Sequence, residues 1–547
     1  MKVLLFFILS FALFLRVWQI DQIPPALNWD EVSHGYNAYS ILKTGKDEWG
    51  IAFPKIFRAY GDYKLPFYVY AVSVSETLFG LRGFSIRFPS VLAGTLSVLF
   101  TFLLVRKIWK NENLGFLASL LLAIEPWSLF LSRVAVEANL ASFLIIGGFY
   151  FLFKGIEKRW FLPFSLLFFG LSLYTYNSAR VFTPLILAVF IFLYYSEIKM
   201  WLRKEKIIIL IGILIFFIFF LPMSIELFSP EGQARYRWVG ILDEGAINRI
   251  NELRNHSVLP HPFQRILYNK LTYFGTHFVK NYLCYFSPNF LFFEGGYHYQ
   301  FNIPKKGLIY PIQIPFIILG LYALFKRRDK ISKLIFAWLL LAPIPASLTR
   351  DSPHTLRTIL MLPLPQILSA LGFWQFLEWI KILKVASFFL FKKVIAGIYL
   401  LALFFFLGNF WFAYATSYRT NYSWAWQYGY KEAVSYLKEN YQKYNWIYFT
   451  KKYGEPHEFV LFYWPWDPQK YLSDPNFKWD YHANWYWVDG FDKFIFVNDW
   501  EIKENVKCLP NNKCLLVTSP NNYPGGWKKI KTINFLDGKP AFEIYEF

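Results

Sequence analysis

The sequence predicts a polytopic α-helical membrane protein of about eleven transmembrane helices, followed by a small C-terminal extracytoplasmic domain of the α/β or α+β class. Apolar residues make up 55% of the chain and charged residues only 17%. The apolar residues fall in blocks of about 17 to 25, long enough to cross the ~30 Å hydrocarbon core of a bilayer. Beyond residue 415 no such block occurs, so the last part of the chain is expected to be soluble.

Short basic linkers between the apolar blocks set the predicted orientation. They lie near residues 106–110, 154–159, 199–206, 326–330 and 381–393, and basic linkers favour the cytoplasmic side. The segment 66–80 is interpreted as a surface helix, because it is short for a span and contains Glu76; counting it as a span would place all five linkers outside. The formal charge of +20 is explained better by contacts with lipid headgroups and by the cytoplasmic bias of basic residues than by binding of nucleic acid. The predicted spans lie near residues 3–20, 88–105, 114–131, 136–153, 160–176, 181–195, 207–225, 307–325, 332–348, 357–379 and 394–415.

The domain prediction is a transmembrane domain over residues 1–415, with large outer loops at 21–87 and 226–306, and a soluble domain over 416–547. The first apolar segment is interpreted as an uncleaved anchor, because no small-residue cleavage site follows it; a cleaved signal peptide is the alternative. The short loops and the lack of organelle signals predict a prokaryotic plasma membrane.

The C-terminal pattern predicts a helix over 430–441 and a hairpin turn over 536–539 before a strand at 541–545. Tryptophan-rich stretches at 463–466 and 485–487 are candidates for stacking on sugars, but a use in the core or an interface is favoured. Cys508 and Cys514 flank a turn-forming insert and are expected to be able to pair on an oxidising side of the membrane, with Cys284 left unpaired. Further strands are predicted at 446–450, 459–463, 494–497 and 515–518.

Two adjacent carboxylates, Asp30 and Glu31, stand just beyond the first apolar segment. A carboxylate at a membrane face can take a proton from a hydroxyl group, so the pair is a candidate catalytic centre. The alternative is structural, because an acid in the first turn of a helix over 32–42 would stabilise the start of that helix.

Basic residues on the same predicted face suit an anionic lipid headgroup, because a guanidinium group binds phosphate in bidentate fashion. Arg133 and Arg180 have a second interpretation as snorkelling anchors at the ends of spans. Asp62 and His354 fall on this face as well. The basic set comprises Lys64, Arg87, Arg133, Arg180 and Arg357.

The outer loop resembles family 39 of the glycosyltransferases, which includes the protein O-mannosyltransferases and the lipid A aminoarabinose transferase and has the GT-C fold. The resemblance covers roughly residues 1–415 and rests on Trp29-Asp30-Glu31, Tyr36-Asn37-Ala38-Tyr39, Lys64-Leu65-Pro66-Phe67-Tyr68 and Arg87-Phe88-Pro89-Ser90.

The resemblance implies transfer of a sugar from a polyprenyl-phosphate carrier to an acceptor on the non-cytoplasmic side. It makes Asp30 the general base and directs Lys64 and Arg87 toward the carrier phosphate. Tyr174 with Arg180, and His354 with Arg357, match stretches found in bacterial homologues.

The chain departs from the family in two places. The Pro-Pro pair of the family is Leu65-Pro66 here. Where the aminoarabinose transferase has a zinc-binding Glu, this chain has Tyr63. The histidines of the large outer loop match no standard metal spacing, so no metal ligand is predicted, although a divalent metal is left open. These histidines are His256, His261, His277 and His298.

The predicted reaction is a single displacement that inverts the anomeric carbon, with Asp30 as base and Glu31 orienting the acceptor or a basic neighbour. The expected partners are the polyprenyl-phosphate sugar donor, membrane lipid, and an acceptor that is protein, glycan or lipid. Two alternatives stay open: a lipid or sugar transporter or flippase, which usually places polar sites at the midplane, and a polymer ligase of similar architecture.

Overall fold

The computed structural model describes residues 2–382 and 388–547. The chain divides into two compact units, each built from segments that are distant in sequence. Unit 1 comprises residues 1–18, 90–132 and 136–410. Unit 2 comprises residues 19–89, 133–135 and 411–547. The first predicted outer loop therefore packs in one unit with the C-terminal residues.

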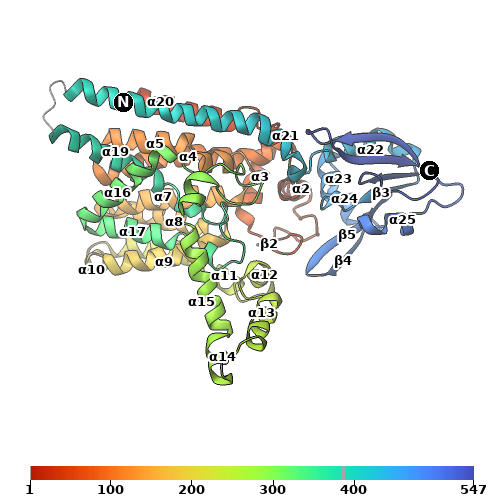
Figure 1. Ribbon diagram of the computed structural model, residues 1–547, viewed down its shortest axis with the longest axis horizontal. Coiled ribbons are helices and arrows are strands. Elements are labelled where there is room, and N and C mark those ends of the chain that lie inside the picture. The colour runs from red at the N-terminus through yellow and green to blue at the C-terminus, as the bar shows by residue number, and fades with distance from the viewer. Residues whose placement is uncertain (1, 383–387) are drawn as a thin grey trace. The chain divides into compact units, whose positions relative to one another are not determined.

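Unit 1 is helical (Figure 1), and its longest helices are apolar. Within the unit, α16 packs along α19, and α8 packs against both α7 and α11. Its principal helices are α1 (Lys2–Val17), α4 (Gly83–Trp109, which begins in unit 2), α5 (Glu112–Ile124), α6 (Pro126–Leu131), α7 (Glu137–Glu157), α8 (Leu162–Ser172), α9 (Asn177–Leu193), α10 (Tyr195–Lys204), α11 (Lys206–Glu226), α12 (Pro230–Val239), α13 (Glu244–Asn255), α14 (His261–Leu267), α15 (Lys270–Cys284), α16 (Ile314–Arg327), α17 (Lys330–Leu341), α18 (Ile344–Ser347), α19 (Leu364–Ile382) and α20 (Phe388–Ala413).

Six helices among the described residues are long and apolar enough to cross a membrane. A seventh span is obtained if α9 and α10, bent by 82° at Tyr194, are counted together. This number and composition make the chain a multi-pass membrane protein. The six run over Gly83–Trp109, Glu137–Glu157, Lys206–Glu226, Lys330–Ser347, Ile359–Ile380 and Leu390–Asn421.

The predicted count of eleven spans is not confirmed. The predicted span at 114–131 is divided, because α5 ends before Glu125 and Pro126 starts α6. The helix at 159–172 and α16 are also shorter than a full crossing. The fifth predicted basic linker, near 381–393, falls partly outside the described residues.

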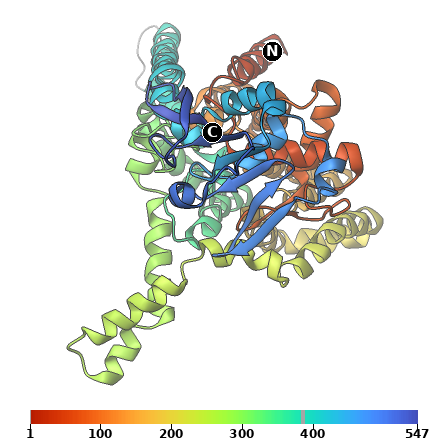
Figure 2. The same cartoon turned by 90° about the vertical axis from the view of Figure 1, so that its right-hand side faces the viewer.

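The large loop of unit 1 is itself helical. Figures 1 and 2 show α13, α14 and α15 extending away from the other helices of the unit. Asp243 caps α13 by accepting from the Ala246 amide, and Asn269 caps α15 in a capping box with Thr272. The predicted outer loop 226–306 is therefore mostly ordered helix.

The N-terminal part of unit 2 holds α2 (Trp29–Thr44), a hairpin of β1 (Phe57–Arg58) and β2 (Tyr63–Lys64), and α3 (Pro66–Phe79). Pro66 occupies the first turn of α3, where a missing N–H group costs nothing. Glycine follows both helices, Gly45 after α2 and Gly80 after α3, each with positive φ. The expected helix over 66–80 is thus present.

The C-terminal part of unit 2 is a seven-stranded sheet in the order β4-β5-β6-β3-β7-β9-β8, accompanied by short helices (Figure 2). The central strand β3 is parallel to β6 and β7, and the outer strands are antiparallel. A C-terminal domain of mixed helices and strands, as predicted, is confirmed. The elements are α22 (Tyr430–Asn440), β3 (Trp446–Thr450), α23 (Pro456–Tyr463), α24 (Pro468–Leu472), β4 (Lys478–His482), β5 (Trp485–Phe491), β6 (Phe494–Val497), β7 (Cys514–Thr518), β8 (Lys528–Asn534) and β9 (Pro540–Glu546).

One strand prediction in this part is wrong. Residues 459–463 belong to helix α23, which begins at Pro456 and is buried on all sides from Pro456 to Phe462. A short apolar run fits a buried helix as well as a buried strand, and the proline at the helix start decides for the helix. Cys508 and Cys514 form a disulfide with a Cα–Cα distance of 5.8 Å, and Cys284 is a free cysteine.

Candidate functional site

The start of α2 carries the two predicted catalytic carboxylates. Asn28 caps the helix by accepting from the Glu31 amide at 3.0 Å, and Glu31 accepts in return from the Asn28 amide at 3.2 Å. This capping box fixes the backbone at the first turn. Asp30 and Glu31 occupy successive positions of that turn, so their side chains leave the helix in different directions.

Glu31 is fully buried and holds Arg87, which is also fully buried. Arg87 donates from Nε to Glu31 Oε1 and from Nη2 to Oε2, both at 2.8 Å, in a bidentate ion pair. Arg87 also donates to the carbonyl oxygens of Ile20 at 2.5 Å and Ala26 at 2.6 Å. The pair therefore joins the start of α2 to the chain that leads into it and to α4.

Arg133 belongs to the same buried assembly. Its Nη2 donates to the Ile23 carbonyl at 2.8 Å, and its guanidinium lies 5.0 Å from the ring centre of Trp411. Burial lowers the pKa of Arg133 below its ordinary value. Two residues further on, the Ala135 amide donates to Glu31 Oε1 at 2.9 Å. The interpretation of Arg133 as a snorkelling anchor does not fit, because its side chain is buried.

Asp30 is in a different environment from Glu31. Its side chain is 34% exposed and forms an ion pair with Lys64, with 2.9 Å between Asp30 Oδ1 and Lys64 Nζ. The Lys64 side chain is 19% exposed. Lys64 is at the end of the β1–β2 hairpin. Asp62 lies in the turn of that hairpin, where its carbonyl accepts from the Ala59 amide at 3.0 Å and its side chain is largely buried. The hairpin thus brings Lys64 to Asp30.

Aromatic residues that the sequence analysis did not assign to the site surround the start of α2. Trp29 donates from its amide to Gln427 Oε1 at 2.8 Å, and the Tyr60 hydroxyl donates to the Trp29 carbonyl at 3.0 Å. Trp485 stacks on Tyr60 with ring centres 5.6 Å apart. Gly454, at φ +116°, leaves room for the Trp29 ring, which a Cβ would approach to 2.0 Å. Trp485 is thus engaged in packing within unit 2, the use favoured from the sequence.

Tyr174 and Arg180 lie in unit 1 on either side of the start of α9. Arg180 is buried and donates from Nε to the Leu173 carbonyl and from Nη1 to Asn177 Oδ1, both at 3.3 Å. Its Nη2 has no acceptor within the described part of the chain. Tyr174 is half-buried and packs against Phe219.

His354 and Arg357 also lie in unit 1, in the segment before α19. Arg357 donates from Nη1 to Thr349 Oγ1 at 2.8 Å and pairs with Asp351 at 3.4 Å, while its Nε lacks an acceptor among the residues described. The His354 ring centre is 5.6 Å from that of His298. Burial and the charge of Arg357 hold the pKa of His354 well below its ordinary value, so His354 is neutral at pH 7.

The predicted residues thus form separate groups within each unit. In unit 2, Asp30 and Lys64 place a solvent-accessible carboxylate beside an ammonium group. Glu31 and Arg87 form a buried ion pair in which both charged groups also hydrogen-bond to the backbone. In unit 1, Arg180 and Arg357 each keep a buried donor suited to an anion. Among the described residues one group has metal-binding donors in reach of one another: Glu48, His457 and Glu458. Sequence reasoning missed this group, because Glu48 is about 400 residues away from the adjacent His457 and Glu458.

Comparison with known proteins gives one family match and several structural matches. Residues 64–225 match the family described as dolichyl-phosphate-mannose-protein mannosyltransferase. No curated protein sequence matches the chain.

Solved structures match over most of the chain at low identity. ArnT from Cupriavidus metallidurans, bound to undecaprenyl phosphate, is 12% identical with a TM-score of 0.58, covering 99% of this chain and 97% of that one. The archaeal oligosaccharyltransferase AglB from Archaeoglobus fulgidus, in complex with an inhibitory peptide and a dolichol-phosphate, is 14% identical with a TM-score of 0.53. That match covers 84% of this chain and 63% of AglB. Both neighbours are GT-C glycosyltransferases. The predicted resemblance to family 39 of the glycosyltransferases is confirmed, and the chain has the GT-C fold.

Proposed function

We propose that this protein is a membrane glycosyltransferase that moves a sugar from a polyprenyl-phosphate carrier to an acceptor on the extracytoplasmic face, with Asp30 as general base. The observation that carries the proposal is the Asp30–Lys64 pair, an accessible carboxylate and ammonium held 2.9 Å apart. The family match and the two neighbours whose structures hold polyprenyl-type phosphates support the class of donor.

The chemistry that we assign to Asp30 is removal of a proton from the acceptor hydroxyl or amine. The acceptor atom then forms a bond to the anomeric carbon while the bond from that carbon to the phosphate oxygen breaks, and the electron pair stays on the phosphate. One such displacement inverts the anomeric centre. The leaving phosphate gains negative charge, which a positioned cation stabilises in the transition state.

Lys64 is suited to serve both partners in turn. An ammonium group has three donors and a flexible stem, and Lys64 is partly exposed. In this proposal a carrier phosphate draws Lys64 toward itself, which frees Asp30 to accept the proton. Without donor, the ion pair with Lys64 keeps Asp30 occupied.

Glu31, Arg87 and Arg133 are assigned positioning roles. Their burial and hydrogen bonds to one another's segments support this assignment over direct contact with substrate. Arg180 and Arg357 stay proposed contacts to an anionic ligand, because each keeps a buried N–H group without an acceptor in the described chain. Tyr174 and His354 are proposed to line the same anion-binding part of unit 1.

The extracytoplasmic placement of unit 2 rests on two independent arguments. The disulfide Cys508–Cys514 suits an oxidising compartment. The basic linkers at 106–110, 154–159, 199–206 and 326–330 favour the cytoplasmic side for the opposite ends of the spans. Orientation is checked by labelling single cysteines, introduced in unit 2 and in the 326–330 linker, with a membrane-impermeant reagent in whole cells.

The test of function is transfer of radiolabelled sugar from a panel of polyprenyl-phosphate donors, in membranes carrying the wild-type chain or Asp30→Asn. The variant keeps the shape of the side chain and removes the base, so a loss of about a hundredfold or more is expected. Asp480→Asn is the matched control, because Asp480 is an exposed residue of unit 2 that pairs with the exposed His482. Full activity of Asp30→Asn would contradict the assignment of the base.

A further inference from the structure

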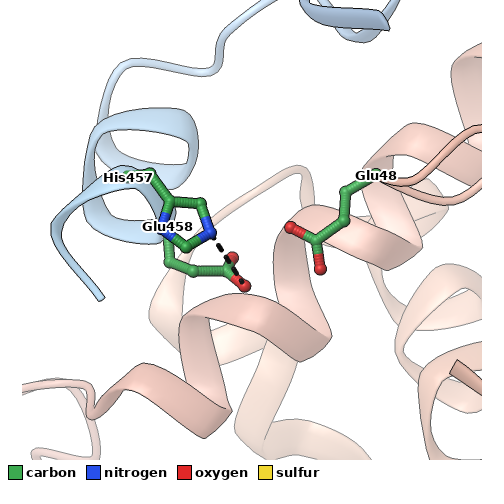
Figure 3. Close-up of side chains that lie close together, drawn as sticks. All are labelled: Glu48, His457 and Glu458. Carbon is green, nitrogen blue, oxygen red and sulfur yellow. Dashed lines mark ion pairs between the residues drawn. The ribbon is translucent and has the colours of Figure 1, made fainter. Parts of the chain in front are cut away.

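A second cluster of ionisable residues in unit 2 has no part in the proposed transfer reaction. Glu48 comes from the loop that follows α2, and His457 and Glu458 come from the first turn of α23. Figure 3 shows the Glu48 carboxylate pointing toward the His457 ring and the Glu458 carboxylate. All three side chains are buried, with 3%, 2% and 1% of their surface exposed in that order.

The donor atoms are arranged as metal ligands are. One ring nitrogen and one oxygen from each carboxylate lie within 4.8 Å of one another. An ion bound at about 2.0 to 2.2 Å from each donor needs donor–donor distances of about 3 to 4 Å. Binding an ion therefore requires the two Glu side chains to move closer to His457 than they are here.

Each carboxylate is held by one oxygen and offers the other. Asn37 Nδ2 donates to Glu48 Oε1 at 2.7 Å, and the Tyr60 hydroxyl donates to Glu458 Oε1 at 3.3 Å. Glu48 Oε2 and Glu458 Oε2 are buried and accept no hydrogen bond from an N–H group of the described residues, while the two carboxyl groups lie close enough to share a proton. Buried oxygens of this kind are costly without a cation or a proton.

A third carboxylate, Glu455, lies near the histidine. His457 Nδ1 lies 3.5 Å from Glu455 Oε2, and Glu455 Oε1 accepts from Trp485 Nε1 at 2.5 Å. His457 Nε2 lies 3.9 Å from Glu458 Oε1. His457 Nδ1 makes no hydrogen bond within the described chain, so Glu455 contributes negative charge near the ring, and Nε2 is the nitrogen on the Glu458 side.

We propose that Glu48, His457 and Glu458 bind one divalent transition-metal ion, with Zn²⁺ as the best fit, which ties the loop after α2 to α23 within unit 2. One imidazole with two carboxylates favours Zn²⁺ or Mn²⁺ over Mg²⁺ and Ca²⁺, which prefer oxygen donors alone. Three donors leave a fourth position of a tetrahedral ion to the second oxygen of a carboxylate or to a water molecule, and full burial of the cluster keeps substrate from it, so the ion would be structural.

Protons are the competing occupants of the cluster. Burial raises the pKa of Glu48 to about 8, and burial together with the charge of Glu48 raises the pKa of Glu458 well above its ordinary value. A metal-free chain would hold these carboxyls largely protonated at pH 7, sharing hydrogen bonds. The two occupants differ in metal content, which makes them separable by experiment.

The experiment measures bound metal in the purified full chain in detergent by mass spectrometry. The chain is stripped with a chelator, dialysed against Zn²⁺, Mn²⁺ or Mg²⁺ separately, and freed of excess ion. About one Zn²⁺ per chain is expected, with a melting temperature that rises on adding Zn²⁺ to the stripped wild type and little response to Mg²⁺. The rise in the wild type needs no variant and therefore tests the proposal even where a variant fails to fold.

The variants His457→Gln and Glu458→Gln locate the ion, with His482→Gln as the matched control at an exposed histidine of the same unit. Loss of bound Zn²⁺ in the first two and its retention in the control supports the proposal. Zn²⁺ retained by His457→Gln and Glu458→Gln places the ion elsewhere and overturns it. A stripped wild type that takes up no ion and melts unchanged overturns it as well, and leaves a proton-sharing carboxyl pair. The result is independent of the transfer assay, because no readout depends on activity.

Discussion

Asp30 and Glu31 are neighbours in sequence with opposite surroundings. Glu31 is fully buried and accepts from Arg87 twice, from Ala135 and from Asn28. Asp30 is about a third exposed and pairs with one lysine that is itself partly exposed. Two adjacent positions in one helical turn therefore hold a buried structural carboxylate, Glu31, and an accessible one, Asp30.

The contrast shows that, of two adjacent carboxylates, one can stabilise the fold while the other is available for the reaction. A buried ion pair contributes little net stability, but removing one partner leaves a buried charge and is strongly destabilising. An exposed pair contributes about 0 to 1 kcal/mol, so its residues can change partners during a reaction.

The largest expected effect is on folding, from Glu31→Ala. The variant leaves the Arg87 guanidinium buried without its carboxylate, which costs about 3 to 5 kcal/mol of unfolding free energy. Thermal unfolding in detergent, followed by size-exclusion fluorescence, measures the loss. An unchanged melting temperature would show that the Glu31–Arg87 pair does not brace the start of α2.

The next effect is on activity, from Lys64→Met. Loss of the ammonium group removes the proposed stabilisation of the leaving phosphate, so kcat/KM for the donor falls by about ten- to a hundredfold. The melting temperature should barely move, because the pair is partly exposed. Lys528→Met, at an exposed lysine of strand β8, is the control. Equal activity of Lys64→Met and this control contradicts the role of Lys64.

A buried carboxyl without a cation provides a third case, Glu76 in α3. Neither of its oxygens has a hydrogen-bond partner among the described residues, and burial raises its pKa to about 9. The folded chain binds a proton there that the unfolded chain releases above its ordinary pKa, so Glu76 makes stability fall as pH rises from about 4.5 to about 9.

Glu76→Gln should therefore raise the stability of the protein by about 1 to 3 kcal/mol at pH 8 and flatten its pH dependence. Melting curves of wild type and variant across that pH range make the comparison. Parallel curves for the two proteins would show that Glu76 does not titrate between the folded and unfolded states in this way.

The smallest effect is expected from Asn28→Ala, which removes the cap of α2. Such a loss costs about 1 kcal/mol. Hydrogen exchange at the Glu31 amide, which donates to Asn28 Oδ1, reports the change directly. Unchanged protection of that amide would argue against the cap as the element that holds Asp30 and Glu31 in place.

The fold class and several individual helices and strands could be predicted from the sequence. The helix over 66–80, strands at 446–450 and 494–497, and the C-terminal hairpin were predicted and are present. The likeness to family 39 was carried by short motifs around Asp30, Lys64 and Arg87. The helix at 456–463 was missed, since apolar periodicity cannot tell a short buried helix from a strand.

The partners of the site residues were harder to predict. A guanidinium group binds carboxylate and phosphate equally well. We therefore predicted from the sequence that Arg87 contacts the substrate phosphate. In the structure, Arg87 donates to Glu31 and to two carbonyl groups. Spacing along the chain carries no information on Glu48 and His457, which only the tertiary fold brings together. Span counting was limited by breaks such as that at Glu125 and Pro126.

The most direct test of the central contrast measures transfer activity and melting temperature on the same preparations of Asp30→Asn and Glu31→Gln. We predict that the free energy of unfolding of Asp30→Asn stays within about 1 kcal/mol of the wild-type value. Its transfer activity should fall by about a hundredfold or more. Glu31→Gln should be clearly destabilised, because Arg87 loses its charged partner, and should keep activity in proportion to its folded fraction. Full activity in Asp30→Asn, or an inactive Glu31→Gln that melts like the wild type, would contradict the division of roles between the two carboxylates.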